Sequence, residues 1–181
     1  MNTNRKNIFI ITGDKNIGKT SFCQAIVKVL RPEKKITGII SPGQYIDEKK
    51  NGILAVDISS QKQILLAKYA PGWDKNNLQR EWQFNHDAMV WGNQVLEKST
   101  PTEILVVDEI GFLELEQNLG WTAIFPAMES KNFLNAIIVV RPCLLSIALD
   151  KWLVNEIIEI SSTSKLDILK CNLIDQLFTS K

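Results

Sequence analysis

Residues 13–20 read Gly-Asp-Lys-Asn-Ile-Gly-Lys-Thr and fit the pattern G-x-x-x-x-G-K-S/T. The apolar run at 8–11 precedes this segment, and a helical pattern over 21–27 follows it. In a strand, loop and helix of this order, the N–H groups of the loop and the N-terminus of the helix bind a polyphosphate together. The motif therefore constrains the chain to an α/β fold whose first strand ends in a phosphate-binding loop.

The residue types in this loop predict a site for a nucleoside triphosphate. Lys19 is expected to reach the β and γ oxygens, and Thr20 to offer its hydroxyl to Mg²⁺. The residues expected to line the nucleotide are Gly13, Asp14, Lys15, Asn16, Ile17, Gly18, Lys19, Thr20 and Ser21.

A second motif occupies residues 104–111, Ile-Leu-Val-Val-Asp-Glu-Ile-Gly. Its apolar half predicts a buried parallel strand, and two carboxylates follow where that strand ends. Ligands of doubly wound sheets bind at the carboxyl ends of the strands, so we expect Asp108 to face the Mg²⁺ held by Thr20. Glu109 is expected to polarise a water in line with the γ-phosphate, which is hydrolysis chemistry. The alternative is a polar junction between strand and loop.

Length and composition agree with one domain over residues 1–181. A net charge of +1 gives no electrostatic footprint for nucleic acid or an anionic membrane. No apolar run approaches the roughly 18 residues that span a bilayer, and residues 1–7 lack the apolar core of a signal peptide. Cys23, Cys143 and Cys171 are isolated in apolar segments, which predicts a reducing cytoplasm and buried packing thiols rather than disulfides or a zinc site.

Strand and helix patterns alternate along the chain. Further strands are expected at 36–40, 135–140 and 155–160, and helices from the loop to about residue 30 and at 86–98, 117–131, 144–152 and 165–178. Asn85 is expected as the N-cap of the helix at 86–98. Short strands at 45–47, 52–58 and 63–67, joined by polar turns at 48–51 and 59–61, predict a small antiparallel hairpin insertion. The loop at 41–44 is expected to open towards the nucleotide. The pattern predicts a doubly wound, mostly parallel sheet flanked by helices.

Several residues outside the two motifs have competing interpretations. Arg141 directly follows an apolar strand, so it is either a contact for the γ-phosphate or a surface arginine at a strand end. Glu114 is expected either to orient Glu109 or the metal waters, or to be a solvated loop carboxylate. His86, the single histidine, is expected at a helix start and not in catalysis. An aromatic cluster is expected in the core rather than stacked on a base: Trp82, Phe84 and Trp91.

These motifs together resemble a known family. The phosphate loop, the strand at 38–40, the hairpin insertion and above all Val-Asp-Glu-Ile-Gly-Phe-Leu-Glu-Leu over 107–115 are similar to the small stand-alone P-loop nucleoside-triphosphatases, the cancer-related nucleoside-triphosphatase family. The resemblance implies a RecA-like sheet and Mg²⁺-dependent hydrolysis of ATP, GTP and other nucleoside triphosphates to diphosphate and phosphate. It also implies that Lys19 and Thr20 bind the phosphate and the metal. Asp108 would bind the metal, and Glu109 would act on the attacking water.

The chain departs from the family pattern between the two loop glycines, where members usually carry more glycine and proline. Asn16 tolerates a left-handed backbone, so the loop can still form. The Asp14 carboxylate should weaken polyphosphate binding unless it turns to solvent or pairs with Lys15.

Two other functions share the phosphate loop. A small nucleoside or nucleotide kinase needs an arginine-rich lid, and this chain has only Arg5, Arg31, Arg80 and Arg141. A non-catalytic switch that binds nucleotide has no need of a carboxylate such as Glu109. Hydrolysis is therefore the favoured function, while the physiological substrate and any protein partner stay open.

Overall fold

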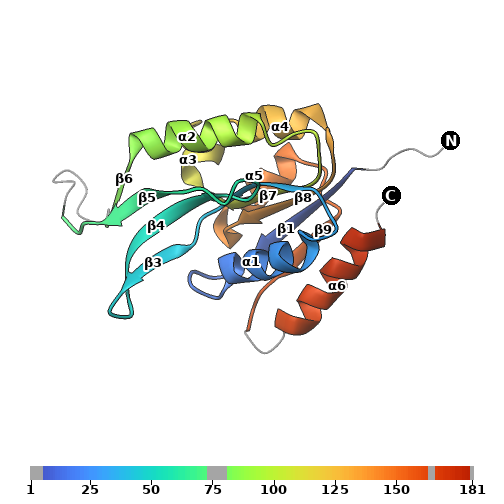
Figure 1. Ribbon diagram of the computed structural model, residues 1–181, viewed down its shortest axis with the longest axis horizontal. Helices are drawn as coiled ribbons and strands as arrows, with labels where there is room; N and C mark the ends of the chain where they lie inside the picture. The colour runs from blue at the N-terminus through green and yellow to red at the C-terminus, as the bar shows by residue number, and fades with distance from the viewer. Residues whose placement is uncertain (1–5, 73–80, 163–165, 180–181) are drawn as a thin grey trace.

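The computed structural model describes residues 6–72, 81–162 and 166–179, which form a sheet with helices on both of its faces (Figure 1). The parallel strands are β1 (Asn7–Thr12), β2 (Ile36–Ile40), β7 (Thr102–Ile110), β8 (Phe133–Val140) and β9 (Glu156–Glu159). An antiparallel extension consists of β3 (Gly43–Ile46), β4 (Lys49–Asp57), β5 (Gln63–Tyr69) and β6 (Trp82–Phe84). The order is β6-β5-β4-β2-β7-β8-β1-β9, with β3 paired to β4. The predicted fold class is confirmed.

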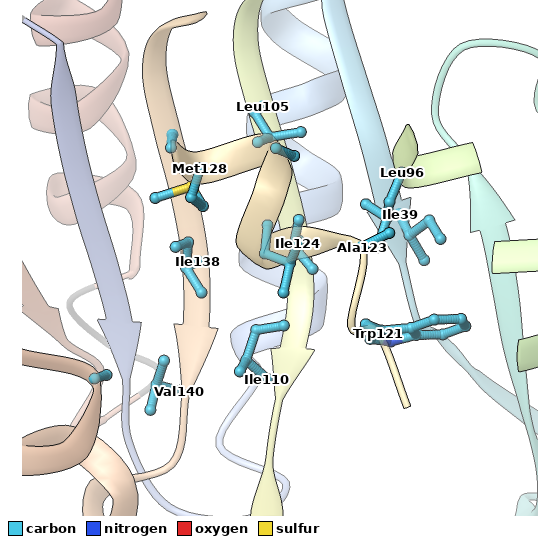
Figure 2. Packing of buried hydrophobic residues seen from close by; sticks show 14 of the residues in the cluster. Ile39, Leu96, Leu105, Ile110, Trp121, Ala123, Ile124, Met128, Ile138 and Val140 are labelled. Carbon is cyan, nitrogen blue, oxygen red and sulfur yellow. The ribbon is translucent and has the colours of Figure 1, made fainter. Parts of the chain in front are cut away.

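Two apolar cores explain why the central strands read as continuous hydrophobic runs. On one face α1 (Lys19–Leu30) and α6 (Leu166–Thr179) cover the sheet. The other face carries α2 (His86–Glu97), α3 (Phe112–Leu115), α4 (Ile124–Ser130), the short 3-10 helix η1 (Pro142–Leu144) and α5 (Leu145–Lys151). Figure 2 shows Ile124 and Met128 of α4 lying against Leu105 and Ile138 of the sheet. A strand covered on both faces is buried at successive positions and is therefore mostly apolar, as β2 is along its whole length and β8 is from Asn135 onwards.

The sequence prediction of a helix over 117–131 is wrong in its first half. Asn118 and Gly120 have φ of 53° and 71°, values that a right-handed helix does not contain. The helix α4 begins only at Ile124, and Pro126 falls in its first turn, where the missing N–H costs no helical hydrogen bond. The short helix α3 precedes this turn instead.

The start of α2 agrees with the sequence. The Asn85 side chain accepts hydrogen bonds from the N–H groups of Asp87 at 3.0 Å and Ala88 at 3.3 Å, so Asn85 is the N-cap that was predicted. His86 is the exposed first residue of this helix.

Burial corrects two expectations about side chains. Cys23 is buried, but Cys143 and Cys171 are exposed, because η1 and the outer side of α6 carry them at the surface. In the aromatic cluster, Trp91 packs against the core, whereas Trp82 is half-buried and Phe84 is 42% exposed. The two latter residues belong to β6, which pairs with β5 at the rim of the sheet, so only Trp91 meets the expectation. None of the described helices is both long and apolar enough to cross a membrane.

Candidate functional site

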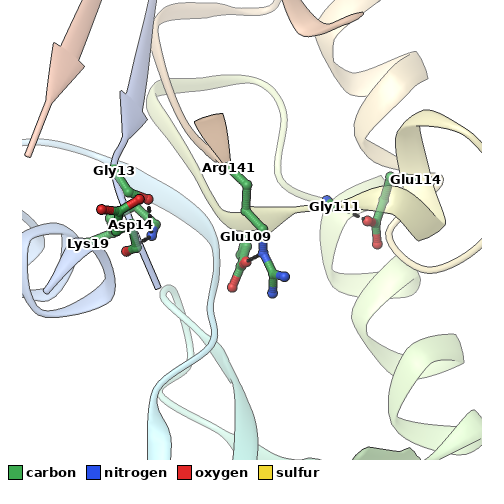
Figure 3. Close-up of polar contacts among 7 residues, drawn as sticks. All are labelled: Gly13, Asp14, Lys19, Glu109, Gly111, Glu114 and Arg141. Atoms are coloured by element: carbon green, nitrogen blue, oxygen red, sulfur yellow. Dashed lines mark hydrogen bonds and ion pairs between the residues drawn. The ribbon is translucent and has the colours of Figure 1, made fainter. Parts of the chain in front are cut away.

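The strand order brings three segments that are distant in sequence to one edge of the sheet. Strand β8 lies between β1 and β7, and all three run parallel. Their carboxyl ends therefore lie side by side, with the loop at 13–18 after β1, Arg141 after β8 and Asp108 near the end of β7. Figure 3 shows Arg141 between the loop and the end of β7.

The loop at 13–18 depends on left-handed backbone at Gly13, Asn16 and Gly18, where φ is 145°, 65° and 105°. A Cβ on Gly13 would lie 2.4 Å from the carbonyl oxygen of Ile160, so only glycine fits against this neighbouring backbone. Asn16 adopts the left-handed conformation that the sequence led us to expect.

Lys19 lies inside this loop and is only 8% exposed. Its Nζ donates to the carbonyl oxygens of Gly13 and Asp14, both at 2.7 Å (Figure 3). Burial lowers the pKa of the ammonium, and the Glu109 carboxylate opposes that shift. The same ammonium also feels the charges of Arg141 and Asp108, so the residues predicted from two separate motifs share one site.

Asp14 is turned to solvent, which is one of the two ways in which its carboxylate could avoid weakening polyphosphate binding. The residue is exposed, and it is its backbone carbonyl that accepts a hydrogen bond from Lys19. Water around an exposed carboxylate screens its repulsion of a bound anion, because the interaction energy falls as the dielectric constant rises. The unfavourable effect of Asp14 on nucleotide affinity is therefore expected to be small.

Asp108 is completely buried and is held from the first residue after β2. Its Oδ2 accepts from the Ser41 N–H at 3.1 Å, and the Ser41 hydroxyl donates to its backbone oxygen at 2.7 Å. Burial raises the pKa of Asp108 to about 6, while the Ser41 N–H and the Thr20 side chain lower it. The predicted opening of the chain after β2 towards this edge is confirmed by Ser41, whereas Gly43 and Gln44 of the predicted loop belong to β3.

The residues present fit a magnesium ion. Asp108 Oδ1 is buried and accepts no hydrogen bond in the described part of the chain. A buried oxygen without a partner is costly, so its position calls for a cation or a donor. The Thr20 hydroxyl acts on the same carboxylate, and carboxylate and hydroxyl oxygens are the ligands that Mg²⁺ prefers.

Glu109 follows Asp108 but has a different environment, because the register of β7 against β8 shifts between Val107 and Ile110. Its carboxylate accepts a hydrogen bond from Arg141 Nε (Figure 3). The Glu109 and Arg141 side chains are 36% and 46% exposed, and ion pairs of this exposure contribute little stability. Glu109 can thus exchange Arg141 for a water molecule at small cost.

Both sequence interpretations of Glu114 are wrong. Its side chain is neither solvated nor turned to the site, because it accepts from the N–H groups of Gly111 and Trp121, each at 2.8 Å. Burial raises the pKa of this carboxyl, and the two N–H groups oppose the shift. A Cβ on Gly120 would lie 2.0 Å from its Oε1, so the turn wraps closely around the carboxylate. Glu114 is therefore a structural cap of α3 and the turn that follows it.

Glu114→Ala should destabilise the fold, because it leaves two backbone N–H groups without their acceptor. We expect a loss of about 2–3 kcal/mol, which lowers the melting temperature by about 5–10 °C in a chain of this size. Thermal unfolding followed by circular dichroism measures this change. Glu116→Ala, at an exposed position two residues away, is the control and should unfold with the wild type. Equal melting temperatures for the two variants would contradict the capping role.

The sequence does not reveal the contact between Lys50 and Trp82. Lys50 was assigned to a polar turn at 48–51, but it lies on β4, and its ammonium lies over the Trp82 ring at 5.4 Å from the centroid. The charges that act on this ammonium include Glu109, Lys15 and Asp108. A polar turn gives no signal of this contact, because β4 and β6 are separated in the sheet by β5 and only the tertiary structure brings the two side chains together.

Comparisons with known proteins agree with this geometry. The model of a family described as NTPase matches residues 8–172. The crystal structure of THEP1 from the hyperthermophile Aquifex aeolicus superposes with a TM-score of 0.68 at 17% identity, covering 94% of this chain and 98% of that one. The solution structure of a human cancer-related nucleoside triphosphatase superposes with a TM-score of 0.74 at 17% identity, covering 98% of this chain and 100% of that one. These likenesses show the fold. No curated protein sequence matches the chain.

Proposed function

The chain belongs to the NTPase family, as its motifs predicted, and from this premise we propose that it hydrolyses nucleoside 5'-triphosphates to the diphosphate and phosphate. ATP and GTP are the expected substrates, together with other nucleoside triphosphates. The proposal includes Mg²⁺ as cofactor. A cytoplasmic location and a single domain over 1–181 stay predictions.

The observation that carries the proposal is the approach of Glu109 to the phosphate loop. The Glu109 carboxylate acts on the Lys19 ammonium and is the neighbour of Asp108, yet it is itself partly exposed and is paired with the likewise exposed side chain of Arg141. A carboxylate that water can reach, next to the position of the γ-phosphate, suits activation of a water molecule. Asp108 is unsuited to that task because it is buried and bonded to Ser41.

The residues then have distinct roles. The loop N–H groups and Lys19 bind the phosphates, and Glu109 takes a proton from the water that attacks the γ-phosphorus. The bond from that phosphorus to the bridging oxygen breaks, and the diphosphate leaves. When bound, Mg²⁺ would neutralise charge on the β and γ oxygens, and Thr20 and Asp108 are the residues that would hold it. Arg141 can turn from Glu109 to the γ-phosphate, whose growing charge it would stabilise.

The distribution of arginines argues against the kinase alternative. Arg31 lies at the far end of α1, about 18 Å from the loop at the usual rise per residue, and it donates to the Ser59 carbonyl. Among the described residues Arg141 is thus the arginine at the site; Arg5 and Arg80 lie outside the described residues. A lid that excludes water from a phosphoryl acceptor needs more than this.

A product assay tests the function directly. The wild-type protein is incubated with ATP, GTP, CTP or UTP, with and without a panel of nucleosides and nucleoside monophosphates. Hydrolysis predicts equal phosphate release in both conditions and no phosphorylated acceptor. Transfer to an acceptor would establish a kinase, and binding without any turnover would establish a switch.

Removal of divalent metal should abolish turnover. We expect phosphate release to stop in excess chelator and to return on addition of Mg²⁺. The reason is that Asp108 has a carboxylate oxygen without a hydrogen-bond partner among the described residues, and that the Thr20 hydroxyl acts on the same carboxylate, so the two groups are suited to bind Mg²⁺ together. Phosphate release at various free Mg²⁺ concentrations measures this. Hydrolysis at the full rate in chelator would refute the metal site.

A further inference from the structure

Lys50 reaches the candidate site from the antiparallel extension, which the phosphate-loop motifs do not include. It pairs with Tyr45 near the tip of the β3–β4 hairpin, yet its Cε lies 2.9 Å from where a Cβ on Gly43 would be. Two residues of strand span about 7 Å, so the side chain runs back along β3 towards the base of the hairpin. That base is anchored to the site, because Ser41 holds Asp108.

A built support holds the ammonium in this position. It lies over the Trp82 ring at 5.4 Å from the centroid, and Tyr69 contacts the same ring edge-on at a centroid distance of 5.4 Å. A cation over an indole ring gains about 0.5–2 kcal/mol, depending on how far it is desolvated. Gly43 leaves room for the side chain, so the position of Lys50 depends on β3, β4 and β6 together.

The charges around Lys50 are those of the candidate site. Burial lowers the pKa of its ammonium, Glu109 opposes this most strongly, and Lys15, Asp108 and Arg141 also act on it. Like charges brought together repel each other, so a gathering of Lys15, Lys50 and Arg141 favours a polyanion between them. Glu109, the residue proposed to activate water, is the carboxylate that acts most strongly on Lys50, which indicates the γ-phosphate end of the nucleotide.

We propose that Lys50 contacts the γ-phosphate of a bound nucleoside triphosphate, as a cation supplied within the same chain by the β3–β4 hairpin. This inference rests on the proposed function for its substrate. In this role Lys50 would let the hairpin distinguish a triphosphate from a diphosphate. It would also supply a positive charge at a site where Arg141 is the arginine among the described residues.

Binding of two nucleotides to matched variants tests the inference. Affinities for ADP and for a non-hydrolysable ATP analogue, both with Mg²⁺, are measured by calorimetry for the wild type, Lys50→Met and Lys50→Arg. Lys50→Met should weaken binding of the analogue by about 10- to 100-fold and leave ADP affinity unchanged, as expected for one charge-assisted hydrogen bond. Lys50→Arg should keep most of the triphosphate preference, because guanidinium is also cationic and stacks on indole.

The neighbouring lysine provides the control. Lys49 is exposed on the opposite face of the same strand and pairs with Ile46, so Lys49→Met removes the same charge from the hairpin without removing the proposed contact. It should bind both nucleotides as the wild type does. Trp82→Leu removes the ring beneath Lys50 and should reduce the triphosphate preference about two- to fivefold. Melting temperatures establish that each variant is folded.

The results separate this inference from the proposed function. A triphosphate preference kept in both Lys50→Met and Trp82→Leu would overturn the inference, as would an equal loss of affinity for both nucleotides. Phosphate release by the wild type is measured in parallel. If the wild type released no phosphate, the proposed hydrolysis would be contradicted but the inference about Lys50 would not. The ratio of the affinities for the ATP analogue and for ADP would still report whether Lys50 contacts the third phosphate.

Discussion

Glu109→Gln should lower the turnover of nucleoside triphosphates by about two to four orders of magnitude, the usual effect of losing a general base. Glutamine has the size of glutamate and keeps an oxygen that accepts the hydrogen bond from Arg141 Nε. It lacks the negative charge that attracts a proton from water. Because the phosphate loop is unchanged, nucleotide affinity should change little.

Phosphate release and nucleotide Kd under saturating Mg²⁺ measure the two quantities separately. Glu116→Gln makes the same chemical change at an exposed position and should hydrolyse as the wild type does. A Glu109→Gln variant as active as the wild type would exclude Glu109 as the base. Glu114 could not replace it, because both of its carboxylate oxygens accept backbone hydrogen bonds.

Lys19→Ala should abolish productive triphosphate binding. The ammonium is the loop's buried cation, and each charge-assisted hydrogen bond to a phosphate contributes about 1.5–3 kcal/mol, so we expect Kd to rise by about 100-fold or more. The substitution also removes the donor that the carbonyls of Gly13 and Asp14 share. The loop should therefore lose order as well as charge.

Thermal stabilisation by nucleotide measures this loss, because a ligand that binds only the folded state raises its melting temperature. The wild type should melt at a higher temperature with a triphosphate and Mg²⁺, and Lys19→Ala should not. Lys28→Ala, on the exposed side of the last turn of α1, is the control and should keep the shift. Wild-type turnover in Lys19→Ala would refute the phosphate-binding loop.

The elements that the sequence predicted are those whose signal is local. The strand β1, the loop at 13–18 and α1 follow from an apolar run, two glycines and a helical pattern that are contiguous in the chain. The N-cap Asn85 is equally local, since its side chain bonds to the next turn. The prediction of a helix over 117–131 was wrong in its first half, because residues with a left-handed backbone there do not alter the pattern of hydrophobic residues.

The sequence by itself determined the class of the fold and the residues of the two motifs, because residue type and spacing carry that information. Only the tertiary structure decided what each charged group meets. Insertion of β8 between β1 and β7 puts Arg141 against Glu109, and the turn after α3 encloses Glu114. The path of Lys50 over Gly43 to Trp82 joins strands that are not neighbours in sequence. Such contacts result from strand order, which depends on pairing between distant segments.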